Sequence, residues 1–347
     1  MEIRAYVTPH IDQVRHIVLE VRVESQQNTV ADEVAALTAV VRPILEGVLR
    51  ALKADIVKEA GGYQKVKLKL LPRMYRQGDG DCGICFEYAV HDAMNRADSS
   101  VLERVEDALK THCRITGVAP SSILFGAEKS GAVQLIETVK DRLTDESALL
   151  GGARGRPVKL KRHIDTVTTA FRRPNARLNL PQSISGLWKA DLFLGMGDAD
   201  RWVGTTVKIN VNQLEAAKGL RVGIVPTKQG KSDKVFKDEQ RNLVICPLPH
   251  DADFMEVFYQ GWGIVQQFIA ADANVPKEVA LPRAPERQVA KYLADRREFA
   301  VVEVIDALKP LAQPELLITK AHDATLVAHR EGEATTRAVL APKSKRP

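Results

Sequence analysis

The stretch Gly186–Glu215, GLWKADLFLGMGDADRWVGTTVKINVNQLE, predicts two β-strands joined by a polar turn and followed by a short helix. The first strand, LWKADLFLG, places Asp191 among apolar neighbours, and the second, WVGTTVKIN, places Lys208 between Val207 and Ile209. The intervening GDAD carries the Gly and Asp residues that tight connections favour. This stretch therefore predicts a hydrophobic hairpin with one acid and one lysine in its strands.

Asp and Lys side chains are almost never fully buried unless they are paired. Two interpretations of Asp191 and Lys208 follow. In the first, both side chains lie on the solvated face of the hairpin. In the second, they converge on a metal ion and a phosphate group that is to be cleaved.

Upstream of the hairpin, GICFEYAVHDAMNRA (83–97) predicts a helix with Glu87 in its first turn, where a carboxylate also suits the helix dipole. Downstream, two short strands rich in β-branched residues (220–228 and 242–249) precede a long helix at 251–271. The alternation of these element types predicts an α/β fold.

Residues 1–60 predict packing elements rather than chemistry. A helix over about 30–59 should be kinked or split at Pro43. The further expected elements are strands at 16–25 and 63–71, the second of them basic, and helices at 101–116, 130–147 and 284–297.

The domain organisation that we expect has four parts. Residues 1–80 form a strand and helical region packed on a core at 81–273, which contains a helical insert at 99–150. A helical extension follows at 274–328, and the polar, basic tail at 329–347 is expected to be disordered.

The order of these elements resembles the core of the PD-(D/E)XK nuclease superfamily, over roughly residues 83–250. GICFEYAV matches the helical motif at Glu87, KADLFLG the second motif at Asp191, and TTVKIN the third at Lys208. The resemblance implies a restriction-endonuclease-like mixed central sheet flanked by helices, with helical additions at both ends.

The resemblance also implies an activity, that of a metal-dependent nuclease hydrolysing phosphodiester bonds, in DNA rather than RNA, within restriction or other anti-invader defence. Asp191 and Glu87 would hold Mg²⁺, with Mn²⁺ as the alternative, because hard cations prefer oxygen ligands. Lys208 would orient the attacking water and offset developing negative charge.

The sequence departs from the superfamily pattern two residues before Lys208, where Thr206 stands in place of an acid. In this interpretation Glu215, from the following short helix, supplies the missing metal-binding carboxylate. The alternative function is a non-catalytic nucleic-acid-binding or assembly subunit that retains a nuclease-like fold.

The charge distribution favours a polyanionic partner. The chain of 347 residues has a formal net charge of +6. Residues 65–76 contain five basic residues and no acid, and residues 154–177 contain eight basic residues and one acid. Such clustering is the electrostatic footprint of proteins that bind phosphate backbones. The candidate nucleic-acid-binding residues are Lys67, Lys69, Arg73, Arg162, Arg172 and Arg173.

The cysteines offer a third function, a cysteine-dependent hydrolase or redox protein. Cys82 and Cys85 have C-x-x-C spacing at a helix start, where a thiolate would be stabilised. The surrounding sequence also resembles, loosely, the nucleophile helix of papain-like proteases, with Cys85 as nucleophile and His163 or His250 as base. A zinc site is not favoured, because no second pair of ligands with suitable spacing follows.

The four cysteines do not form the dense pattern of a disulfide scaffold. The N-terminal sequence lacks an apolar signal core, and no run approaches the roughly 18 apolar residues of a membrane span. We therefore expect a cytoplasmic protein with no membrane partner, acting as a homodimer or with a partner subunit.

Overall fold

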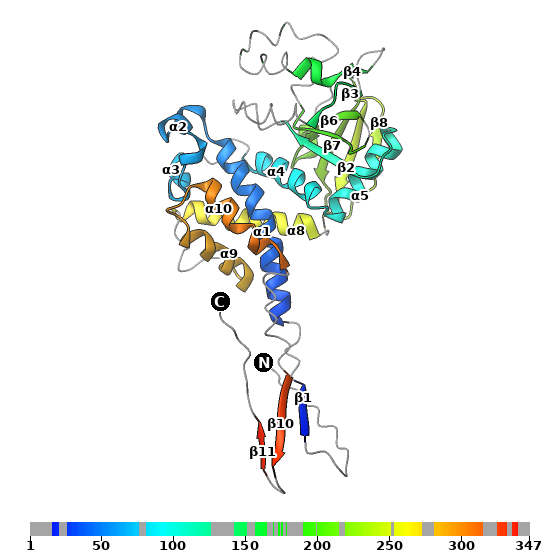
Figure 1. Ribbon diagram of the computed structural model, residues 1–347. Helices are drawn as coiled ribbons and strands as arrows, with labels where there is room; N and C mark the ends of the chain where they lie inside the picture. The colour runs from blue at the N-terminus through cyan, green and yellow to red at the C-terminus, as the bar shows by residue number, and fades with distance from the viewer. Residues whose placement is uncertain are drawn as a thin grey trace.

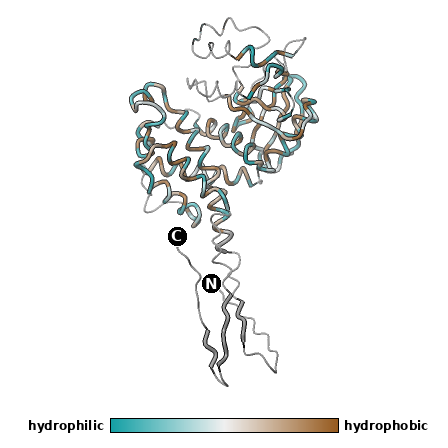
Figure 2. The backbone as a smooth tube through the Cα atoms, viewed as in Figure 1, coloured by the Kyte–Doolittle hydropathy of each residue, from teal (hydrophilic) through white to brown (hydrophobic). Residues whose placement is uncertain are grey.

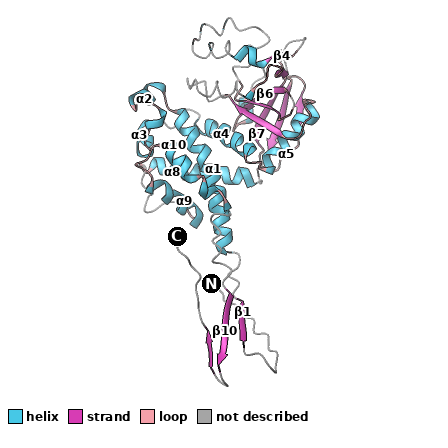
Figure 3. Ribbon diagram, in the orientation of Figure 1, coloured by secondary structure: helices cyan, strands magenta, loops and turns pink. Residues whose placement is uncertain are grey.

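The computed structural model describes residues 16–20, 26–75, 81–125, 142–150, 157–164, 190–198, 200–214, 219–250, 253–272, 281–314, 325–331 and 335–338, with positions 169, 173, 175 and 178 between them. The fold is mixed α/β, with an open mixed sheet flanked by helices, as the sequence predicts. Figure 3 shows a helical lobe beside a lobe that contains the sheet, with helix α4 between them.

The central sheet runs in the order β2-β5-β6-β7-β9-β8. β5 pairs antiparallel with β2 and β6, whereas β6, β7 and β9 are parallel neighbours. The short β3 and β4 pair with each other, and β3 also runs parallel to the start of β6. The strands are β2 (Pro120–Leu124), β3 (Ala148–Leu150), β4 (Val158–Lys159), β5 (Leu192–Met196), β6 (Arg201–Val207), β7 (Arg221–Pro226), β8 (Phe236–Asp238) and β9 (Leu243–Leu248).

The helical lobe is arranged around α1, which contacts α4, α8, α9 and α10 (Figure 1). Helices from both ends of the chain therefore form one packed unit. The helices are α1 (Gln26–Ala51), α2 (Ala54–Glu59), α3 (Leu71–Met74), α4 (Asp81–Asn95), α5 (Ser99–Asp107), α8 (Asp253–Ala270), α9 (Ala284–Asp295) and α10 (Val301–Leu308). Among the described residues, no helix combines the length and apolar character needed to cross a membrane.

The sheet is buried on both faces. Leu192, Leu194 and Val203 join the large core that also contains the apolar sides of α1, α4 and α8. Phe193 and Trp202, which point to the other face, join a second core with residues from β2, β3, β4 and the helical turn at 160–164. In Figure 2, hydrophobic residues recur along the helices and strands of both lobes. This alternation along β5 is what a strand covered on both sides requires.

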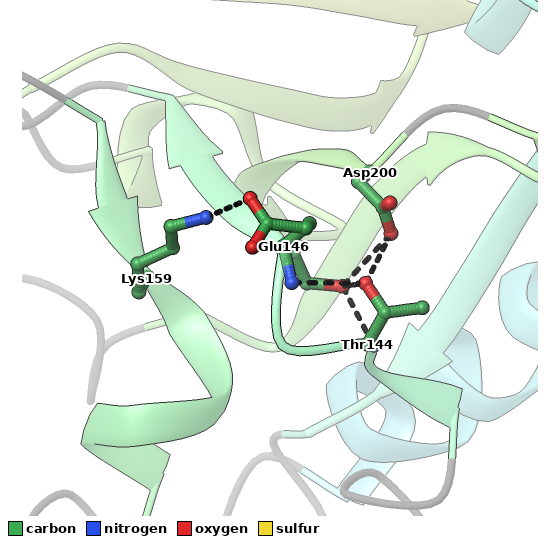
Figure 4. A network of polar contacts seen from close by, with 5 residues as sticks. Thr144, Glu146, Lys159 and Asp200 are labelled. Carbon is green, nitrogen blue, oxygen red and sulfur yellow. Dashed lines mark hydrogen bonds and ion pairs between the residues drawn. The ribbon is translucent and has the colours of Figure 1, made fainter.

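The hairpin of β5 and β6 is held at its turn by a polar network (Figure 4). Thr144 Oγ1 donates to Asp200 Oδ1 at 2.6 Å, and Ser147 Oγ donates to the same oxygen at 3.3 Å. Lys159 forms an ion pair with Glu146 in the same loop. Asp200 of the GDAD turn thus holds the segment that leads into β3.

Two local predictions were wrong. Helix α1 is not split at Pro43 but continues through it, and the chain leaves the helix instead at Leu52 and Lys53. The missing N–H of Pro43 costs about 3 kcal/mol in a helix interior, but packing of α1 against four helices outweighs that cost.

The expected basic strand at 63–71 forms two 3-10 turns, Tyr63–Lys65 and Leu68–Leu70, and then enters α3. Its alternation is real, since Val66 and Leu68 are buried and Lys67 is exposed. The segment lies against residues 297–301, with Val301 N donating to Val66 O at 2.8 Å and Leu68 N donating to Phe299 O at 2.9 Å. This contact amounts to an isolated bridge between Lys67 and Ala300, so no strand ladder forms here among the described residues.

The other expected elements divide into observed and undescribed segments. Asp98 caps α5 by accepting from the Ser100 N–H at 3.1 Å, and a π-helix at Ala108–His112 continues it. The helix expected at 130–147 lies largely outside the described residues. Strand β10 (Thr325–Glu331) pairs antiparallel with β1 (His16–Glu20) and with β11 (Thr335–Ala338), so part of the segment expected to be disordered is assigned to strands.

The contact between α1 and α4 makes a prediction at Gly47. A Cβ atom there would lie 2.7 Å from Cys85 Cα and 3.0 Å from Cys85 N, both in the backbone of α4. We expect Gly47→Ala to lower the free energy of unfolding by about 1–3 kcal/mol in urea titrations, because two helix backbones must move apart.

The matched control is Gly263→Ala in α8, where an added Cβ meets nothing within 4 Å. That substitution should stabilise the protein by up to about 1 kcal/mol through helix propensity. Equal effects of the two substitutions would contradict the close approach of α1 and α4.

Candidate functional site

Three elements bring Glu87, Asp191 and Lys208 to one point. Lys208 Nζ lies 2.9 Å from Asp191 Oδ2 and 3.2 Å from Glu87 Oε1. Glu87 comes from α4, Asp191 immediately precedes β5, and Lys208 immediately follows β6. The two acids are separated by more than a hundred residues in the chain, so the fold rather than local sequence creates this cluster.

The backbone on both sides of the cluster is tied into the sheet. Asp191 N donates to Thr205 O at 2.8 Å, and Phe125 N donates to Asp191 O at 2.9 Å. Lys208 N donates to Ile224 O at 3.0 Å, which joins it to β7. The side chains therefore start from fixed positions, which is the condition for a preorganised site.

Asp191 is buried, with 1% of its surface exposed. Its Oδ2 atom accepts hydrogen bonds from Thr206 Oγ1 at 3.0 Å, from Val207 N at 2.9 Å and from Lys208 Nζ. These donors compensate the loss of water around the carboxylate. Asp191 and Lys208 thus lie at the ends of neighbouring strands, with their side chains in contact. The interpretation that both side chains lie on the solvated face of the hairpin is wrong, because Asp191 is buried.

Lys208 is the cation of this site. Burial by itself lowers the pKa of the ammonium group, but the charges of Asp191 and Glu87 and hydrogen bonds to both outweigh burial and raise the pKa above its usual value of 10.5. Lys208 therefore stays protonated at neutral pH and acts as a positive charge and hydrogen-bond donor, not as a base.

The carboxylates of Asp191 and Glu87 form a donor set suited to a hard cation. Both approach the same nitrogen within 3.2 Å, and both residues are buried, which leaves two anionic oxygens close together. Mg²⁺ commonly uses one or two carboxylates together with substrate phosphates. No cluster of three His, Cys, Asp or Glu residues occurs within the described ranges, and Glu215 lies outside them.

The basic residues expected to bind nucleic acid do not gather at this cluster. Lys67, Lys69 and Arg73 belong to the α3 region of the helical lobe, whereas Arg162 follows β4 on the sheet lobe (Figure 1). Lys69 is paired with Glu298 at 2.6 Å. Arg173 is exposed, and Arg172 lies outside the described residues.

The cysteines have the environment of structural residues. Cys85 is fully buried, its Sγ donates to Ile44 O at 3.4 Å, and burial raises the pKa of its thiol well above 9.0. Burial likewise raises the pKa of Cys82 to about 11. Reactive cysteines need an accessible, stabilised thiolate. This geometry argues against Cys85 as a nucleophile.

A second polar cluster on α4 was not found from the sequence. His91 lies one turn after Glu87, and its Nδ1 is 3.0 Å from the buried Ser122 Oγ of β2. Its Nε2 is 3.1 Å from Asn95 Nδ2. Burial, with a smaller contribution from the charge of Arg142, lowers the pKa of His91 to about 4. The imidazole is therefore neutral at physiological pH and links α4 to the sheet.

Comparisons of the chain with family models, with curated proteins and with solved structures found no match. The functional assignment therefore depends on the chemistry of the residues described above.

The neutral His91 predicts a pH dependence of stability. The unfolded chain binds a proton at this residue below about pH 6.5, whereas the folded protein does so only near pH 4. Stability from this residue is therefore present above pH 6.5 and is lost as the pH falls through this window, by up to roughly 3 kcal/mol.

We expect His91→Gln to remove this component. In urea titrations at pH 7, 5.5 and 4, the difference in unfolding free energy between wild type and variant should shrink as the pH falls, because the His91 contribution is lost. Contributions from the other titrating groups are the same in both proteins and cancel in this difference. A difference that is constant over this range would contradict a buried neutral imidazole.

Proposed function

We propose that this protein is a metal-dependent nuclease that hydrolyses phosphodiester bonds in DNA. The observation that carries the proposal is the position of Lys208 Nζ between the carboxylates of Asp191 and Glu87. The three residues are those that the resemblance to PD-(D/E)XK nucleases singles out: Glu87 lies on a helix, and Asp191 and Lys208 adjoin the ends of two antiparallel neighbouring strands. A restriction-endonuclease-like arrangement of the sheet is part of the same proposal.

The chain's own residues would divide the chemical roles. Asp191 and Glu87 would hold Mg²⁺ or Mn²⁺, and the metal would supply a nucleophilic hydroxide and neutralise charge on the phosphate. Lys208 would donate hydrogen bonds to the attacking water or to a phosphate oxygen, where a fixed cation stabilises developing negative charge. The raised pKa of Lys208 keeps that cation charged over the whole physiological range.

A second candidate, a non-catalytic nucleic-acid-binding subunit, is favoured by one observation. Thr206 Oγ1 donates to Asp191 Oδ2 at the position where the superfamily pattern has a carboxylate. A hydroxyl there supplies a neutral donor, which stabilises Asp191 without a metal ion. The nuclease requires that the two carboxylates of Asp191 and Glu87 are enough to hold the metal, whereas the binding subunit needs no metal.

The first test is cleavage of supercoiled plasmid with Mg²⁺ or Mn²⁺. We expect nicking by wild type, and a loss of at least about 100-fold for Asp191→Asn, Glu87→Gln and Lys208→Met, because each removes a charge or donor aimed at the reacting phosphate. Circular dichroism checks that each variant folds.

The control for Lys208→Met is Lys110→Met. Lys110 is an exposed residue of the π-helix and forms an ion pair with Glu106 of α5. It should cleave as wild type does. DNA binding without cleavage at any metal concentration would exclude the nuclease and support the binding subunit, whereas cleavage that survives all three site substitutions would place the chemistry elsewhere.

The substitution Thr206→Asp tests the metal site without measuring activity. The substitution removes the hydroxyl that donates to buried Asp191 and places a second negative charge beside it. We therefore expect a lower melting temperature in EDTA. Mg²⁺ should then raise the melting temperature of the variant more than that of wild type, because a ligand that binds the folded state stabilises it. Equal shifts for both proteins would argue against a metal at Asp191.

A further inference from the structure

A hollow of about 700 Å³ lies beyond the carboxyl ends of β7 and β9, against one side of α8. We call it the β7–β9 hollow. It is lined by Thr227, Lys228, Lys231, His250 and Tyr259, together with neighbouring polar residues of the same segments. Its volume falls within the range of about 300–1,000 Å³ typical of small-molecule sites.

The lining of the hollow is positive. Its two acids form ion pairs with arginines that do not line the hollow. Asp233 pairs with Arg104 at 2.5 Å, and Glu256 pairs with Arg283 at 3.6 Å. Lys228 and Lys231, in contrast, are exposed and have no ion-pair partner within the described part of the chain. The hollow therefore presents two uncompensated cations to an incoming ligand.

A tight turn brings the backbones of the two lysines close together at the hollow. Lys231 N donates to Lys228 O at 3.0 Å, and Gly230 at the tip has φ +74°, which a residue with a side chain adopts at a cost. The two ammonium groups thus belong to one compact loop. A loop of this kind suits the phosphates of a polyanion rather than a single buried anion.

The lining also includes an exposed aromatic ring, contributed by α8. Tyr259 of α8 is 41% exposed although its helix packs into the large core through Phe258 and Phe254. An aromatic face beside cations is the combination with which proteins hold unpaired bases, the ring stacking on the base and the cations contacting the phosphates. Helix α8 also contacts α4, which carries Glu87.

The hollow and the Lys208 cluster open at the same edge of the sheet. Lys208 follows β6, Thr227 follows β7, and Pro249 follows β9, and the three strands are parallel neighbours. Strands about 4.8 Å apart place these ends within about 10 Å of one another. Ligands of open α/β sheets bind at this edge. One or two nucleotides would span that distance.

We propose that the β7–β9 hollow binds an unpaired nucleotide of the DNA strand, next to the phosphate held at Lys208. Tyr259 stacks on the base, and Lys228 and Lys231 contact the flanking phosphates. The inference rests on the proposed function, because it makes the substrate a strand with an unstacked or single-stranded nucleotide beside the cleavage position.

The test uses a single-stranded oligonucleotide that contains 2-aminopurine, whose fluorescence falls when it stacks on an aromatic ring. The full chain binds it in EDTA, so cleavage does not interfere. We expect quenching by wild type and by Tyr259→Phe, which keeps the ring. Tyr259→Leu should lose the quenching and bind roughly tenfold more weakly.

The lysines are tested through salt dependence. The double variant Lys228→Gln, Lys231→Gln should reduce the slope of log K against log salt by about 1.4, because each phosphate contact on a single strand contributes about 0.7. The matched controls are Tyr292→Leu on α9 and Lys110→Gln on the π-helix, which should leave quenching and slope unchanged.

The outcomes separate this inference from the nuclease itself. Two results would contradict nucleotide binding in the hollow without affecting the proposed nuclease activity. The first is quenching that persists in Tyr259→Leu, and the second is the absence of quenching by a wild-type protein that cleaves plasmid. Quenching that depends on Tyr259, from a protein that never cleaves, would support the hollow and favour the binding subunit.

Discussion

The carboxylate of Asp191 can be buried only because the β5–β6 hairpin surrounds it with donors. The Val207 amide, the Thr206 hydroxyl and the Lys208 ammonium group all bond to one of its oxygens. A buried carboxylate without such partners would cost several kcal/mol. The register of β5 against β6 is therefore fixed by the acid as well as by apolar packing, since a slip of one residue would separate Asp191 from all three donors.

Helix α4 joins the two lobes through different sides of one element. Cys85 packs against α1 at Gly47, Phe86 packs against Phe258 of α8 at 5.1 Å between ring centroids, and Glu87 reaches Lys208. Three consecutive residues thus contact the helical lobe, the wall helix of the hollow and the end of β6. A displacement of α1 or α8 would be transmitted directly to the Glu87 carboxylate, because close-packed interiors transmit strain.

The sequence predicted well where chemistry and apolar pattern coincide. The hairpin and its polar turn follow from local rules, and the mixed α/β fold is confirmed. The basic segment at 63–71 misled because burial alternates at Val66 and Leu68 without any strand beside it, and a ladder needs a partner that only the tertiary fold can supply. Pro43 misled because local propensity was weighed without the four helices that hold α1. Lys228, Lys231 and Tyr259 could not be grouped, since the loop after β7 and the N-terminal half of α8 meet only in three dimensions.

The arrangement of α1 has a consequence for how the chain reaches this fold. Its apolar side chains, Val41, Ile44 and Val48 among them, are buried partly by α4 and partly by helices that begin at residue 253 and beyond. At ribosomal rates of about 5–20 residues per second, the emerging helix waits on the order of ten to forty seconds before those partners are synthesised. High contact order of this kind slows folding and leaves apolar surface exposed in the meantime. Helix α1 can thus complete its native packing only after α8, α9 and α10 have been synthesised, and until then part of its apolar surface must be covered by something else, such as a chaperone.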